Sequence, residues 1–108
     1  MSRYITAGFS FDATHNDPLE TKYLHGHHFE VEVTEQTEVT TKLLDHLEDV
    51  CLELHQHSLD DMLTGGSQTG QGIASWILER LLISHPKIVR LELWWDPRLK
   101  YGITRDIR

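Results

Sequence analysis

The sequence predicts an α+β fold, a four-stranded antiparallel sheet with two helices on one of its faces. Three observations support this prediction. Apolar and polar residues alternate in two stretches near the N-terminus, a helical periodicity runs through two stretches in the middle, and two further strand patterns follow. The order β-β-α-α-β-β fits 108 residues as one domain, 1–108, because elements of these types pack as two layers around a single core.

The first two strands are indicated by alternation of residue type. In residues 4–14, Phe9 and Phe11 fall on one face and polar side chains on the other. Residues 27–36 show the clearest pattern in the chain, because apolar side chains occupy every second position. These apolar residues are Phe29, Val31 and Val33. We expect the two strands to be antiparallel neighbours.

Two helices are predicted in the middle of the chain. Residues 41–56 carry apolar side chains at intervals of three or four, which is typical of a helix with one buried side. Thr40 or Thr41 is its candidate N-cap. The second helix is expected at 70–84, with Thr69 as its N-cap.

The C-terminal part reads as two strands, 88–95 and 100–107, joined by a turn at Asp96-Pro97-Arg98. The stretches 16–23 and 57–69 are expected to be connections. Because the core is small and the sheet has open edges, we expect strands to pair between subunits, so that the protein forms a homo-oligomer.

Composition excludes several classes of partner. The chain has 17 acidic and 10 basic residues, a formal net charge of −7, so nucleic acid and anionic membrane surfaces are unfavourable partners. No apolar stretch is long enough for a membrane span or a signal-peptide core, which predicts a cytoplasmic protein. Cys51 is the only cysteine and lies within an apolar helical pattern, so we expect it in the core.

Eight histidines are present, and the spacing of three of them predicts a metal site. His25 and His27 are two residues apart in the second strand, so they share a face. His15 ends the first strand and approaches the same face if the two strands form a hairpin. Three neutral imidazoles suit Zn²⁺, and three protein ligands leave a fourth position open for water or substrate, as in catalytic zinc sites.

The other histidines are expected to have other roles. A single histidine is more often a surface or hydrogen-bonded core residue than a ligand. His28 points to the opposite face from His27 and is not expected to bind the metal. His46 and His85 read as solvated residues at the sides of the helices.

The histidine motifs carry a family resemblance. Phe11-Asp12-Ala13-Thr14-His15 resembles the F-x-A-A-H opening of the 6-pyruvoyltetrahydropterin and 6-carboxytetrahydropterin synthase superfamily, and 24–29, Leu-His-Gly-His-His-Phe, resembles its L-H-G-H-x-[YF] signature. The resemblance implies the tunnelling fold, zinc on His15, His25 and His27, and a trimer or a hexamer of two trimers in which the sheets close a barrel. It also implies active sites between subunits and a small heterocyclic substrate such as a pterin.

The resemblance breaks at the family's acid–base positions. Thr21 stands where the family has a catalytic cysteine, and a hydroxyl is too weak an acid to supply a thiolate-like base at neutral pH. Glu20 is adjacent and is a candidate substitute base, although a solvated loop acid is the plainer interpretation. The family's Asp-His pair corresponds to Gln56-His57, and a glutamine cannot raise the basicity of His57 as a carboxylate would.

The positions that would bind substrate are also changed. Thr69 and Gln71 correspond to the family's P-T-x-E-N element, with the threonine kept and the glutamate replaced. The strand glutamate that pairs with the pterin's amino-pyrimidinone edge corresponds to Trp95, which offers one donor and no acceptor. A shift of one residue would make Asp96 the anchor instead.

Three functions therefore remain open from the sequence. The first is a zinc-dependent lyase or cyclase of the tetrahydropterin synthase type with rebuilt acid–base residues. The second is a metal-dependent binding protein without turnover on the same scaffold. The third is a purely structural or assembly protein in which the histidines are incidental. A titratable group within reach of a bound ligand would favour the first, and an apolar pocket the second.

Overall fold

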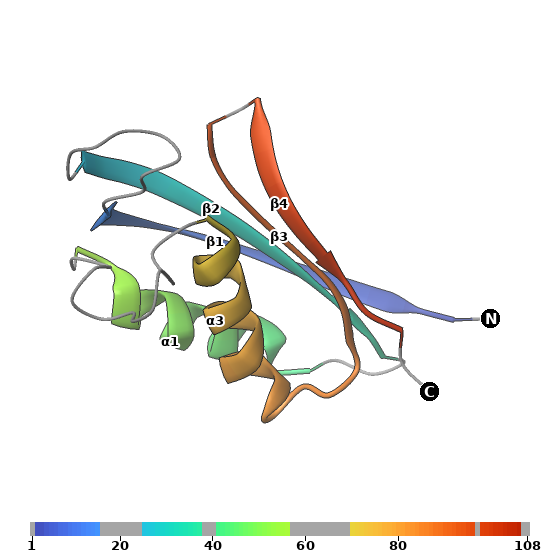
Figure 1. Cartoon of the computed structure of the whole chain (residues 1–108). Coiled ribbons are helices and arrows are strands. Elements are labelled where there is room, and N and C mark those ends of the chain that lie inside the picture. Colours follow the sequence, from blue (N-terminus) through green and yellow to red (C-terminus); the bar gives the residue numbers. More distant parts are fainter. Residues whose placement is uncertain (1, 16–24, 38–40, 57–69, 97, 107–108) are drawn as a thin grey trace.

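The computed structural model describes residues 2–15, 25–37, 41–56, 70–96 and 98–106. Its elements follow the predicted order and form one sheet and one helical layer (Figure 1). They are β1 (Tyr4–His15), β2 (His25–Gln36), α1 (Leu43–Leu54), α3 (Gly70–Leu82), β3 (Ile88–Asp96) and β4 (Leu99–Thr104). The predicted fold class is confirmed. Within the described part of the chain, no helix is both long and apolar enough to cross a membrane.

The sheet is an antiparallel meander with strand order β1-β2-β3-β4. β1 and β2 pair without interruption over twelve residues each, from Tyr4 opposite Gln36 to His15 opposite His25. β3 is less regular, because its pairing shifts opposite Thr34/Glu35 and again between Trp94 and Asp96. The expected antiparallel pairing of the first two strands is therefore confirmed, and the irregularities are confined to β3 and its neighbours.

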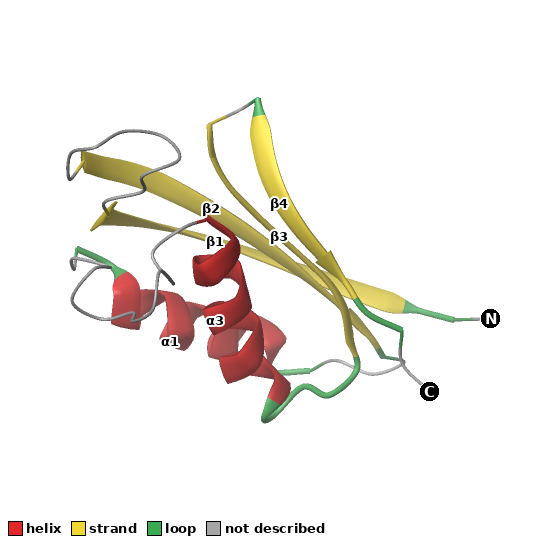
Figure 2. Ribbon diagram, in the orientation of Figure 1, coloured by secondary structure: helices red, strands yellow, loops and turns green. Residues whose placement is uncertain are grey.

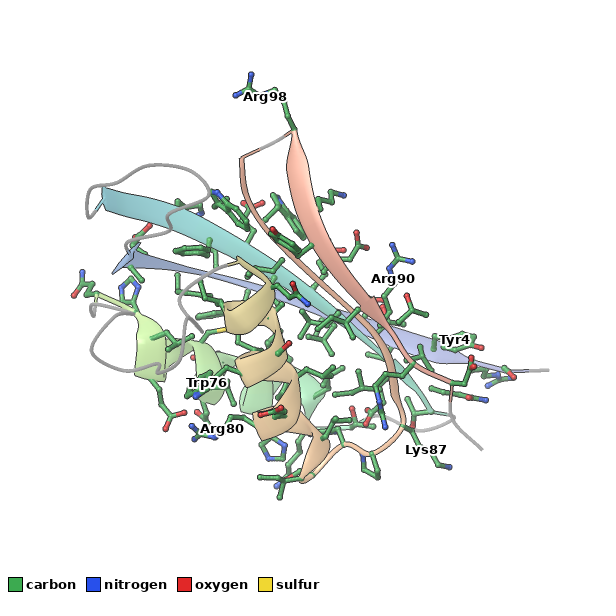
Figure 3. All side chains as sticks on the ribbon, viewed as in Figure 1. Tyr4, Trp76, Arg80, Lys87, Arg90 and Arg98 are labelled. Carbon is green, nitrogen blue, oxygen red and sulfur yellow. The ribbon has the colours of Figure 1, made fainter. Side chains whose placement is uncertain are left out.

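Both helices lie on the same face of the sheet, and the opposite face carries no described element (Figure 2). The alternating buried apolar positions of β1, β2 and β3, among them Phe11, Val31 and Leu91, face this helical layer. The core side chains between the two layers are less than a tenth exposed (Figure 3). The largest of them include Phe11, Phe29, Leu47, Leu54, Ile73, Ile77 and Leu91.

The helix and strand ends differ from the prediction by a few residues, for local reasons. Lys42 is the N-cap of α1, while the Thr41 hydroxyl accepts the backbone N–H of Leu43 at 3.2 Å and so satisfies the first free donor of the helix. β4 ends at Thr104, opposite Arg90, and the backbone N–H of the next residue, Arg105, still donates to the carbonyl oxygen of Val89 at 2.8 Å. Thr40 and Thr69 lie outside the described residues.

The start of α3 packs tightly against β3 and β4. A Cβ at Gly70 would lie 2.3 Å from the Trp95 ring and 2.5 Å from the Tyr101 ring, which is closer than side chains approach. A residue without a side chain is therefore required where the helix crosses these two aromatic residues. By contrast, a Cβ at Gly102 in β4 would meet nothing within 4 Å.

We predict that Gly70→Ala lowers the free energy of unfolding by about 1–3 kcal/mol, because the added methyl group overpacks a filled site. Gly102→Ala, a matched substitution in open space, should change it by less than about 0.5 kcal/mol. Urea denaturation followed by circular dichroism measures both. Equal effects of the two substitutions would contradict the packing explanation.

Candidate active site

The three histidine positions gather at one end of the β1–β2 pair. His15 is the last residue of β1 and is directly opposite His25, the first residue of β2. His27 is opposite Ala13, two residues further in from that end. Residues directly opposite each other in an antiparallel pair share a face, as do residues two apart in one strand. The backbone register therefore assigns all three positions to the face of Ala13, Phe11 and Phe29.

This is the face that the helices cover, and its neighbouring positions are buried. Ala13 is 5% exposed and Phe11 1% exposed. The side chains of His15, His25 and His27 lie outside the described part of the structure. Among the side chains that it does describe, no three His, Cys, Asp or Glu form a group that could hold a metal ion.

The C-terminal end of α1 is tied to β1 next to these positions. The backbone N–H of Asp12 donates to Nδ1 of His55 at 3.1 Å, and the N–H of Gln56 donates to the carbonyl oxygen of Asp12 at 2.5 Å. Gln56 has a positive φ of 60°, which turns the chain out of the helix at this point. The end of the described α1 segment is therefore anchored to Asp12, three residues before His15 in β1.

His28 faces away from this site, as expected. Its Nδ1 lies 2.8 Å from Oδ1 of Asp12 across the strand pair, and both side chains are more than half exposed. The two residues are opposite each other on the uncovered face of the sheet. Such an exposed pair contributes little to stability. The strand alternation places His28 on the opposite side of the sheet from the other three positions.

An aromatic row crosses the covered face next to the histidine positions. Phe11 and Phe29 stack at 5.1 Å between ring centroids, Phe29 meets Trp95 at 6.0 Å, and Trp95 stacks on Tyr101 at 5.7 Å. The row runs through all four strands, one strand position inward from Ala13 and His27 on that face. It would form an apolar floor for a ligand held at the histidine positions.

Trp95 is the extra residue of a bulge in β3. Trp94 is opposite Lys100 and Asp96 is opposite Leu99, so two steps along β3 match one step along β4. The bulge interrupts the alternation at the place where the sequence left open whether Trp95 or Asp96 is the substrate anchor. Trp95 packs against Tyr101 and the start of α3. For Asp96 the structure describes the backbone, and its side chain lies outside the described part.

The remaining predicted site residues are distributed as follows. Gln71 lies in the first turn of α3 and is exposed. Its side chain is therefore accessible to a ligand, and no hydrogen bond from a described residue holds it. The other predicted residues lie outside the described part of the chain: Glu20, Thr21, His57 and Thr69.

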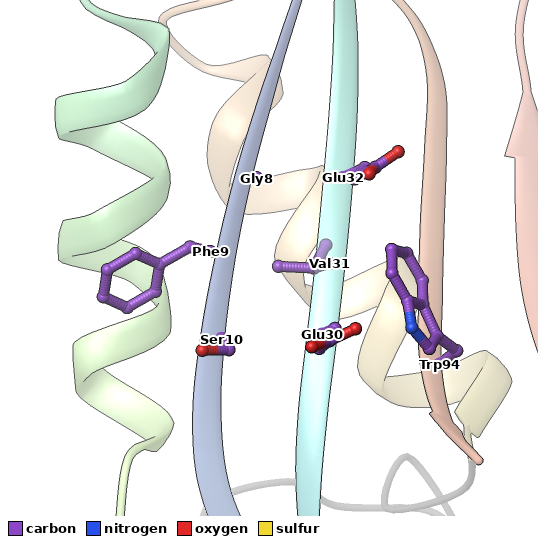
Figure 4. Close-up of a pocket in the computed structure, with 7 residues that line it drawn as sticks. All are labelled: Gly8, Phe9, Ser10, Glu30, Val31, Glu32 and Trp94. Atoms are coloured by element: carbon purple, nitrogen blue, oxygen red, sulfur yellow. The ribbon is translucent and has the colours of Figure 1, made fainter. Parts of the chain in front are cut away.

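A shallow hollow of about 320 Å³ lies elsewhere on the sheet, along β1, β2 and β3 (Figure 4). Its lining includes Glu30, Glu32 and Trp94, which makes it acidic. Glu92 lies beside it in β3; the hydrogen bond from Arg90, together with the charges of Arg90 and Lys100, holds the pKa of that carboxyl below its usual range. No histidine lines this hollow, and we do not assign the active site to it.

Solved structures share this architecture over nearly the whole chain. The 6-pyruvoyl tetrahydropterin synthase of Caenorhabditis elegans superimposes with a TM-score of 0.78 at 17% identity, over 98% of this chain and 97% of that one. An uncharacterized protein from Wolinella succinogenes gives 0.77 at 15% identity, over 98% and 99%. The chain has the fold of the 6-pyruvoyl tetrahydropterin synthases.

A third structure adds a chemical detail. A 6-pyruvoyltetrahydropterin synthase from Plasmodium vivax, described as a catalytic-residue mutant with alanine in place of a glutamate, superimposes with a TM-score of 0.66 at 13% identity, over 99% of each chain. No protein-family model and no curated protein sequence matches the chain. The resemblance inferred from the histidine motifs is thus confirmed at the level of the tetrahydropterin synthase fold.

The only cysteine of the sequence lies in the core. Cys51 is fully buried in α1, as expected for a core residue. Burial raises the pKa of its thiol to about 12, because a thiolate in apolar surroundings loses its hydration. The residue is therefore a packing residue and not a nucleophile.

We predict that Cys51 in the folded protein does not react with a thiol-specific disulfide reagent at pH 8 over minutes, and reacts fully in 6 M guanidinium chloride. The reason is the combination of burial and a protonated thiol. Absorbance of the released chromophore measures both rates, and rapid reaction of the native protein would show that the thiol is accessible.

One interpretation of the sequence was wrong. His85 is not solvated: it is 5% exposed and its Nδ1 lies 2.8 Å from Oε2 of Glu35, which is equally buried. His46 is half-buried and contacts His85. Sequence reasoning missed Glu35, although a signal was present, because Glu35 continues the inward-facing alternation of Val31 and Val33 in β2.

Proposed function

We propose that this protein is a zinc-dependent lyase or cyclase of the tetrahydropterin synthase type, with His15, His25 and His27 as the metal ligands. The observation that carries the proposal is the β1–β2 register, in which His15 is opposite His25 and His27 follows on the same face. Three histidines separated by a nine-residue connection in the sequence thereby occupy adjacent positions at one end of a buried sheet face.

The donor set fits zinc. Three imidazoles are the ligand set of several catalytic zinc sites, and the residue opposite His27 on that face is the small Ala13. Zinc bound there would act as a Lewis acid on an oxygen of the substrate and so acidify a neighbouring C–H bond. The chain's own residues then have to bind the heterocycle, exclude water and move the proton.

Glu20 is the residue that we propose as the base. Thr21 occupies the position of the family's cysteine, and its hydroxyl cannot hold a negative charge near neutral pH. A carboxylate in this role has support from the Plasmodium vivax enzyme, in which a glutamate is described as a catalytic residue. His57 follows the anchored Gln56 and is proposed as the second proton-transfer group.

The substrate is proposed to be pterin-like or another small heterocycle. Thr69, Gln71, Trp95 and Asp96 are its candidate contacts. The packing of Trp95 against Tyr101 and Gly70 favours a divergent substrate, because an indole held in the aromatic row cannot accept the two N–H groups of an amino-pyrimidinone edge. Leaving those donors unpaired would cost several kcal/mol of binding free energy.

The same observation supports a second candidate function, a metal-dependent binding protein without turnover. An aromatic floor of Phe29, Trp95 and Tyr101 is sufficient for binding a flat ligand without turnover. The two candidates differ in whether Glu20 and His57 act on the bound ligand. In either case, we propose a homotrimer or homohexamer, since β1 and β4 are the edges of the described sheet and are available for pairing with another copy.

We predict that His27→Ala removes the zinc that survives dialysis against a mild chelator, from about one per chain to less than a tenth. His28→Ala, the neighbouring residue on the opposite face, should keep it. Elemental analysis of untagged protein measures both variants. Equal zinc content in the two variants, or none in the wild type, would overturn the site.

The catalytic part of the proposal requires a ligand. A thermal-shift panel of pterins, deazapurines and related nucleosides identifies the compounds that stabilise the zinc-loaded protein. Turnover of those compounds is then followed by chromatography. A compound that raises the melting temperature and is converted supports the lyase, while stabilisation without conversion supports the binding protein.

For a converted compound, we predict that Glu20→Gln lowers kcat by about 10²–10⁴-fold, because it removes a general base. Thr21→Ala should lower it by less than about tenfold. Zinc content serves as the control for both variants. A Thr21→Ala enzyme that is inactive with its zinc intact would refute the assignment of the base.

A further inference from the structure

A second cluster of polar side chains lies far from the candidate active site. Glu35 is near the end of β2, ten residues from His25, which corresponds to about 33 Å along an extended strand. His85 lies in the connection from α3 to β3, and His46 lies in the first turns of α1. Three separate parts of the chain therefore meet here.

The three side chains form a linear chain of contacts. Oε2 of Glu35 lies 2.8 Å from Nδ1 of His85, and Nε2 of His85 lies 2.6 Å from Nδ1 of His46. Glu35 and His85 are each 5% exposed, whereas His46 is half-buried and lines a surface groove of about 270 Å³. The groove gives solvent access to the outer end of a buried polar chain.

Glu35 pairs with a side chain that can carry a positive charge, His85. Oε1 of Glu35 is buried without a hydrogen-bond partner, and a buried carboxylate requires a compensating positive charge. Arg80 lines the groove but is paired with Glu53, and Arg105 donates to backbone carbonyls of Pro86 and Ile88. These two arginines are therefore engaged elsewhere, and His85 is the side chain that pairs with Glu35.

The ring orientation matches that of a metal-binding histidine. Such a histidine donates one ring N–H to a carboxylate and presents the other nitrogen to the metal. Here Nδ1 of His85 is directed to Glu35, and Nε2 is directed to His46 at the groove. In a tetrahedral zinc site the two nitrogens would lie about 3.3 Å apart, so metal binding requires the two rings to separate and both nitrogens to turn toward one point.

We propose that His46 and His85 form a second binding site for a divalent transition metal such as Zn²⁺, with Glu35 as the carboxylate that orients His85. Asp49 supplies the third ligand. It lies three residues after His46 in α1 and lines the same groove. No three described side chains yet form such a group, so metal binding requires the exposed Asp49 side chain to rotate inward.

Zinc titration of the full-length protein, freed of metal by a chelating resin, tests this site. Wild-type protein should bind two equivalents per chain, and His46→Gln should bind one fewer. Asp49→Asn should weaken the second equivalent by at least tenfold, and Glu35→Gln should weaken it by about 10–100-fold. Asp45→Asn, a matched change in the same helix away from the groove, should behave as wild type. Circular dichroism confirms that each variant is folded.

The outcome also separates this site from the proposed active site. If His15, His25 and His27 bind no metal, the wild type binds one equivalent and His46→Gln none. The second site is overturned if His46→Gln and Asp49→Asn titrate as the wild type does. It is also overturned if zinc binding is absent and only the pH dependence of stability changes in His46→Gln, which would identify the cluster as a proton site alone.

Discussion

The uninterrupted pairing of β1 with β2 is the constraint on which the rest of the structure depends. Twelve residues of each strand are matched without a bulge, and the alternation places Phe11 on Phe29 at the centre of the covered face. A slip of one residue would turn every one of these side chains to the opposite face. The apolar contact with the helices therefore fixes the register, and the register in turn brings His15 opposite His25. Core packing and the candidate chemistry have the same cause.

The helical layer depends on this face and completes the site. α1 buries Leu47 and Leu54 against it, and its last turn is held by two hydrogen bonds to Asp12. α3 begins at a glycine because Trp95 and Tyr101 occupy the space where a side chain would be. The end of α1 thus meets β1 at Asp12, and the start of α3 meets the aromatic row at Trp95 and Tyr101. The candidate site lies where four elements converge, which is a frequent location for ligands in small folds.

Much of this could be predicted from the sequence. The strands and helices could be predicted because apolar residues recur with a period of two in the strands and of 3.6 in the helices. The shared face of the histidines followed from the strand period. The sequence could not decide whether Trp95 or Asp96 occupies the anchor position, because a bulge adds one residue and breaks the alternation on which the alignment relied. His85 was misread because its burial depends on Glu35, fifty residues earlier in the chain, and no local pattern reports such a contact. The roles of Glu20, Thr21 and His57 stay predictions.

The β1–β2 register also restricts how this protein can change during evolution. Substitution of a single side chain can leave the ladder of backbone hydrogen bonds untouched. Insertion or deletion of a single residue within β1 or β2 cannot leave the ladder untouched. It would invert the faces on one side of the change and separate His15 from its partners. Length variation is therefore expected between His15 and His25 or within the bulged β3. A lineage built on this scaffold can exchange its chemistry residue by residue while the spacing of its histidines stays fixed.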